Sequence, residues 1–193
     1  MRHTTLFLLA LLLALPCMGQ NKKQSERIKQ IRETFGTTMK LIERNSEDPE
    51  YTDNSIHLQM NRMQPGAGMQ HYKIDMYIED HGNEETMEQD WRPYFFRVKY
   101  NFAAREIVQE HLIDAASGKP IFIFVKLPDD DGMYEDRIYY NADGSFCYAT
   151  QTKYENPDGK KTVKVLTKDD DNVMSAINFS YDIMKWAHDT QNF

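Results

Sequence analysis

The segment at residues 120–127 constrains the fold more than any other part of the chain, because it is apolar on both sides of an extended strand. One side would carry Ile121, Ile123 and Val125, and the other Phe122 and Phe124. A short run rich in β-branched and aromatic residues on both sides is typical of a strand covered on both faces. Eight residues are too few for an ordinary buried helix. We therefore expect the middle of an antiparallel sheet, with Ile123 and Phe124 both nearly inaccessible to solvent.

Two segments near the ends of the chain have the three- and four-residue spacing of amphipathic helices. The first is expected to begin at Ser25, a favourable N-cap, and to stop at residues 45–49. Its apolar positions are Ile28, Ile31, Phe35, Met39 and Ile42. The second follows three aspartates at 169–171, which suit a helix start. Its apolar positions are Val173, Met174, Ile177, Tyr181, Met184 and Ala187.

The chain between these helices predicts an antiparallel meander of roughly seven or eight strands, hence an α+β fold in one domain at residues 20–193. Residues 55–63 and 69–78 alternate, with apolar side chains at even positions in both. If these side chains share a face, the residue numbers of two residues paired across the strands must have an even sum. A three-residue loop at 65–67 makes that sum 132 and places His57 opposite Asp75.

Further strands are expected at 94–102, 120–127, 134–140, 145–154 and 160–166, with residues 79–89 as a loop. Residues 103–112 have helical propensity. The hairpin loop at 114–119 that follows instead favours a bend at 103–104 and then a strand. Glycine-ended turns at 141–144 and 156–159 join the last strands. The first turn predicts Tyr140 opposite Phe146 and Tyr139 opposite Cys147.

Residues 1–19 have the pattern of a secretory signal peptide: Arg2, an apolar run at 6–15, and small residues at 17 and 19. That run is shorter than the roughly 20 residues needed to span a bilayer. We expect cleavage before Gln20 and an exported protein, in the periplasm, at the cell surface or outside the cell. A membrane-associated N-terminal helix and lipid attachment at Cys17 remain alternatives.

The loss of this leader, which contains Arg2, would leave 174 residues with 22 basic and 30 acidic side chains, a net charge of −8. This acidity argues against nucleic acid and anionic membranes as partners, and we expect no integral membrane segment after the leader. Cys147 would be the one remaining cysteine, so a disulfide framework is excluded. Its expected place beneath a helix favours an unreactive thiol.

The sequence has no nucleophile elbow, no zinc-protease motif and no glycine-rich phosphate loop. Its most suggestive polar group is the odd-numbered face of the first hairpin: His57, Gln59, Asn61, His71, Lys73, Asp75 and Tyr77. A histidine opposite a carboxylate can orient a general base or support a metal ligand. Cross-strand polar pairs on a solvated face are the alternative interpretation.

The acidic turn at 129–131 could offer oxygen ligands to calcium, but the EF-hand spacing would put Leu127 in the first ligand position. We therefore expect no metal and no cofactor. Four aromatic residues at strand ends or on the mixed face are candidates for exposure and ligand stacking: Trp91, Tyr94, Tyr134 and Tyr139.

The leader, the turn at 62–68 and the segment at 95–105 resemble exported α+β proteins of gut-dwelling Gram-negative bacteria, a group without an assigned activity. The resemblance implies location and fold type. Our first hypothesis is a non-enzymatic binding or accessory module of the bacterial envelope, with a small ligand or an envelope protein as its partner. The alternatives are a hydrolase using His57, His71 and Asp75, and a purely structural subunit. The candidate binding residues are His57, Asn61, His71, Asp75, Trp91, Tyr94, Tyr134 and Tyr139.

Overall fold

The computed structural model of the protein describes residues 22–47, 54–66, 68–83, 85–87, 89–102, 105–130, 132–155 and 159–191. In chain order these residues form α2 (Lys22–Glu47), β1 (Ser55–Gln64), β2 (Gly68–Asp80), β3 (Trp91–Phe102), β4 (Arg105–Asp114), β5 (Lys119–Asp129), β6 (Gly132–Tyr140), β7 (Phe146–Glu155), β8 (Lys161–Leu166) and α3 (Asp171–Gln191). The predicted order of helix, meander and helix is confirmed.

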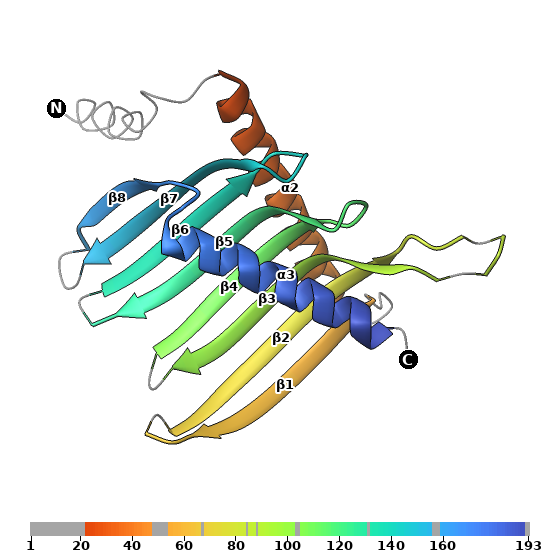
Figure 1. The fold of residues 1–193 in the computed structure, drawn as a ribbon, viewed down its shortest axis with the longest axis horizontal. Helices are drawn as coiled ribbons and strands as arrows, with labels where there is room; N and C mark the ends of the chain where they lie inside the picture. Colours follow the sequence, from red (N-terminus) through yellow and green to blue (C-terminus); the bar gives the residue numbers. More distant parts are fainter. Residues whose placement is uncertain are drawn as a thin grey trace.

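All eight strands belong to one antiparallel sheet, in which every strand pairs with its neighbours in sequence. The two helices cover opposite faces of this sheet: α3 crosses the near face diagonally in Figure 1, and α2 lies behind it. The apolar segment at 120–127 lies in β5, inside the sheet, as its composition predicts.

The face beneath α3 holds two of the three buried clusters in the described residues. At the start of α3, Val173 and Ala176 pack on Ile123 and Ile138. Towards its end, Ala187 packs among Ile74, Met76, Phe96 and Val98. Ile123 has 0% exposure, so its predicted burial is confirmed.

The first hairpin has the predicted register. β1 and β2 pair with a constant sum of 132, which places His57 opposite Asp75 and Asn61 opposite His71. Gly66 and Gly68 both have φ of 81°, a conformation that glycine adopts without strain. Residues 105–114 form a strand, as the hairpin loop after them predicts.

Three local expectations are wrong. The first helix already includes Lys22, so Ser25 lies within its first turns and is not the N-cap. A bulge between β6 and β7 leaves Tyr140 opposite Phe146 but puts Tyr139 opposite Tyr148, with Cys147 displaced from the ladder.

The third wrong expectation is that Ile121 lies on the same side of the strand as Ile123. A second bulge, between β4 and β5, turns Ile121 toward α2, away from the side of Ile123. The bend at 103–104, most of the turn at 156–159 and the leader lie outside the described residues.

Candidate functional site

The face of the sheet that carries α2 has an apolar row of side chains running across six strands. Successive cross-strand partners in this row are Tyr77, Phe95, Leu112, Phe122, Tyr139 and Tyr148. The helix buries Ile28 and Ile31 against the middle of the row. Phe35 meets Phe122 edge-on, with ring centroids 5.1 Å apart. The predicted apolar stripe of the first helix therefore does face the sheet.

The next row of partners, two residues along each strand, is mostly polar. It consists of His57, Asp75, Arg97, Glu110, Phe124 and Arg137. α2 packs on the apolar row and reaches Arg97 of this second row through Met39, whereas Phe124 in the same row is only half-buried. The expectation that Phe124 is nearly inaccessible is therefore wrong.

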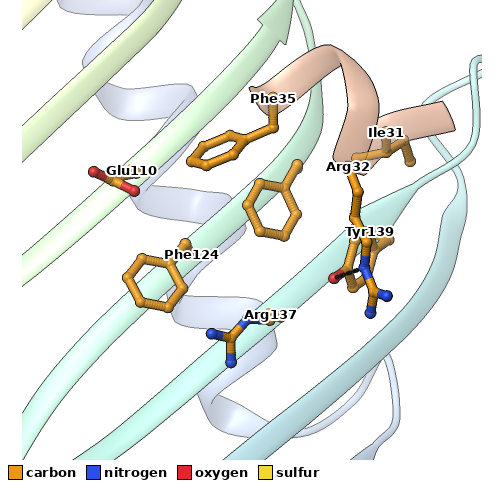
Figure 2. Close-up of a pocket in the computed structure, with 8 residues that line it drawn as sticks. Ile31, Arg32, Phe35, Glu110, Phe124, Arg137 and Tyr139 are labelled. Atoms are coloured by element: carbon orange, nitrogen blue, oxygen red, sulfur yellow. Dashed lines mark hydrogen bonds between the residues drawn. The ribbon is translucent and has the colours of Figure 1, made fainter. Parts of the chain in front are cut away.

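A cavity of about 300 Å³ lies where these two rows meet the side of α2. We call it the α2 cavity; its lining is Ile31, Arg32, Phe35, Glu110, Phe122, Phe124, Arg137 and Tyr139. In Figure 2, Phe35 from the helix and Phe124 from the sheet approach the same space, and Arg32 and Arg137 lie on one side of it. The lining thus combines four aromatic rings with two guanidinium groups and the carboxylate of Glu110.

The charged side chains around the α2 cavity are partly neutralised. Arg97 Nε donates a 2.7 Å hydrogen bond to Glu110, and Arg137 Nη2 donates one of 2.7 Å to Glu135. Arg32 Nε donates at 3.2 Å to the hydroxyl of Tyr139, and in the described part of the chain no carboxylate pairs with Arg32. These three arginines and two glutamates leave one net positive charge, in a chain whose net charge is −7.

The polar residues predicted on the first hairpin come together in two pairs. His57 Nδ1 lies 2.7 Å from Asp75 Oδ1, and His71 Nδ1 lies 2.6 Å from Asn61 Oδ1. Burial of the Asp75 carboxyl acts to raise its pKa, but hydrogen bonds from His57 and Lys73 outweigh this and lower the pKa. Asp75 is therefore ionised at neutral pH.

Ser55, which was not among the predicted residues, joins the first of these pairs: its Oγ lies 3.0 Å from Nε2 of His57. Ser55 and His57 are two residues apart on one strand, so their side chains share a face. The spacing of two residues between Ser55 and His57 in the sequence could therefore have predicted that these side chains lie together. The result is a chain of hydrogen bonds from Ser55 through His57 to Asp75.

The four predicted aromatic candidates do not form one surface. Trp91, Tyr94 and Tyr134 are half-exposed at separate places. Trp91 lines a groove by the end of α3, Tyr94 contacts Tyr77, and Tyr134 lies beneath Lys153. Tyr139 has 1% exposure because α2 covers it, so its predicted exposure is wrong.

The acidic turn and the cysteine show no assembled chemistry in the described residues. Asp130 pairs with Arg105, and no three metal-ligating side chains gather among the residues that the structure describes. Cys147 packs against the buried residues between α2 and the sheet, and burial raises the pKa of its thiol, which disfavours the reactive thiolate.

No family model, curated protein or solved structure matches this chain. Neither α2 nor α3, as far as each is described, has an apolar stretch long enough to cross a membrane.

Proposed function

We propose that the protein is a non-enzymatic exported binding module that takes a small amphipathic anion into the α2 cavity. The observation that carries the proposal is the lining itself: four aromatic rings beside Arg32 and Arg137, in an acidic chain. Small-molecule sites are typically mostly apolar clefts with a few well-placed polar groups. The signal-peptide pattern of residues 1–19 supports the exported location.

The rings favour a ligand with a flat apolar body. Phe35 and Phe124 are half-buried and present ring surface to the cavity, which the buried Phe122 also lines. Contact of a ligand ring with these rings adds to the gain from burial. A volume of about 300 Å³ is at the lower end for ligand sites, which favours one or two fused rings over a long acyl chain.

The arginines favour an anionic group on that ligand. Arg32 donates through Nε to Tyr139, so its two Nη groups remain available to a carboxylate or sulfonate. Arg137 lies over the ring of Phe124 at 5.2 Å and also reaches the cavity. A guanidinium binds two oxygens of such an oxyanion through two parallel hydrogen bonds, which gives both affinity and orientation.

We expect naphthoate to bind with saturable heat in isothermal titration calorimetry. Arg32→Gln should weaken this binding about tenfold, because it removes a hydrogen bond between two charged groups. The control is Lys29→Gln, which removes the same charge from an exposed site of α2 whose ion-pair partner is Glu33 at 3.8 Å. Naphthalene methanol, the neutral analogue, should bind weakly to all three proteins.

The outcomes separate the two parts of the proposal. No saturable heat with naphthoate would remove the small-ligand function. Equal binding of naphthoate and its neutral analogue, unaffected by Arg32→Gln, would remove the requirement for an anion.

A second candidate function, ester hydrolysis, is favoured by the hydrogen-bond chain of Ser55, His57 and Asp75. Nδ1–H of His57 can donate to Asp75, which leaves Nε2 to take the proton of the Ser55 hydroxyl as its oxygen attacks an acyl carbon. The alcohol would leave with that proton, and water would then release the acid. His71 is not part of this chain, because it bonds Asn61.

If this candidate is correct, the protein hydrolyses p-nitrophenyl acetate, and Ser55→Ala lowers the rate at least about a hundredfold. Asp75→Asn should lower it as well, since His57 would lose its orienting carboxylate. Ser117→Ala, at an exposed turn serine, is the control. A wild-type rate equal to that of Ser55→Ala would eliminate the hydrolase.

A further inference from the structure

β1 forms one edge of the sheet. β1 pairs with β2 over its full length, and no strand in the described residues pairs with its other side. The N–H of Ile78 donates to the carbonyl of Asn54 at 2.9 Å, which identifies this pair as hydrogen-bonded. Because hydrogen-bonded pairs alternate along an antiparallel ladder, the N–H and C=O groups of His57, Gln59 and Asn61 point to the open side.

This edge has one of the features that usually prevent strands from pairing between molecules, the charged side chain of Arg62 near the end of β1. β1 has ten residues, no proline or lysine, and no register shift against β2. β8, at the opposite edge, has six residues and carries Lys161 and Lys164. Edge strands are commonly protected against pairing with another chain by being short and by carrying lysine. β8 has both of these features, and β1 has neither.

An apolar strip also reaches the open edge on the side of α3. Ile56 and Leu58 are half-buried next to the cluster under α3, and Met60 is 46% exposed. Inner strands bury such residues against neighbours on both sides. β1 has a neighbour on one side, so part of this surface still contacts solvent.

We propose that β1 pairs antiparallel with β1 of a second copy of this chain, which joins the two sheets into one. The second copy is the fitting partner because β1 complements itself. With partner numbers summing to 116, Leu58 faces its own copy and Ile56 faces Met60. In this register the outward N–H and C=O groups of His57 meet those of Gln59. A sum of 118 would instead put Arg62 against Ile56, which would leave a charge on apolar surface.

The pairing is independent of the proposed ligand site. The twofold axis of the dimer would pass between the two copies of Leu58 at the edge of the sheet. The α2 cavity is instead built on β4, β5 and β6. Failure of dimerisation would therefore leave the ligand proposal intact, and the reverse also holds.

Sedimentation of the purified protein tests the inference, and we expect a dimer for the wild type. Gln59→Pro removes one N–H that points to the open edge and leaves the β1–β2 ladder intact. It should raise the dissociation constant of the dimer at least about tenfold. Gln59→Ala keeps the N–H and should dimerise like the wild type.

Two single-cysteine variants, compared with each other, identify the register even if Gln59→Pro fails to fold. In a Cys147→Ala background, Leu58→Cys should form an intermolecular disulfide, since facing residues of a non-hydrogen-bonded pair have Cα atoms about 4.5 Å apart. Met60→Cys is the control, because its own copy would lie four residues along, about 13 Å away. A wild-type monomer at about 100 μM, or a Gln59→Pro dimer as tight as the wild type, would overturn the proposal.

Discussion

Lowering the pH from 7 to 4 should cost the protein roughly 3 kcal/mol of unfolding free energy through His111 alone. This residue of β4 has 0% exposure. Its ring stacks on Phe96 at 4.3 Å, and Phe179 of α3 lies 5.9 Å away. Burial lowers the pKa of His111 to about 3, from an ordinary value of 6.5.

The direction in which stability changes with pH depends on whether the folded or the unfolded state binds the proton of His111. Below pH 6.5 the unfolded chain protonates His111, and the folded protein does so only near pH 3. The unfolded state therefore holds more protons in this window, and stability falls as the pH falls from 6.5 toward 3. Above pH 6.5 both states hold a neutral ring, and the effect is absent.

Urea unfolding of the wild type and of His111→Leu at pH 7 and pH 4 measures this contribution. The wild type should lose roughly 3 kcal/mol more than the variant between the two pH values. Carboxylates such as Asp75 also weaken the fold in acid, but they do so in both proteins and cancel in the difference. His71→Gln, at an exposed histidine, should behave like the wild type. Parallel losses in His111→Leu and wild type would contradict the prediction.

The sequence could predict the register of the first hairpin, because two independent signals agreed there. Apolar residues at even positions required an even partner sum, and the turn at 65–67 selected 132. The hairpin at 141–144 has an equally clear turn. Its register was still missed beyond Tyr140, since the bulge at Cys147 leaves no mark in the alternation of side chains.

The α2 cavity could not be predicted, because it depends on how far α2 reaches across the sheet. The periodicity of α2 shows which side chains face the sheet, and says nothing of which strands they meet. Tyr139 falls beneath the helix and Phe124 beside it. His111 was missed for a related reason: it lies among polar residues of β4, and α3 buries it all the same.

Ile123→Ala should destabilise the protein by about 3–4 kcal/mol, the usual cost of emptying a fully buried site. Ile123 lies beneath α3, between Ile138 and His111 on the neighbouring strands. Urea unfolding at neutral pH measures the loss. Naphthoate affinity should stay within about twofold of the wild type, since the α2 cavity is on the opposite face of the sheet.

Phe124→Ala should show the reverse pattern, although the two residues are adjacent in β5. Its ring is half-buried, with Arg137 above it at 5.2 Å, so truncation removes less contact area and should cost roughly 1 kcal/mol. The same truncation removes one of the rings that face the ligand, and naphthoate binding should weaken by at least about tenfold. A stability loss in Phe124→Ala as large as that in Ile123→Ala would show that α2 covers this part of the sheet in solution. Unchanged naphthoate binding in Phe124→Ala would place the ligand elsewhere.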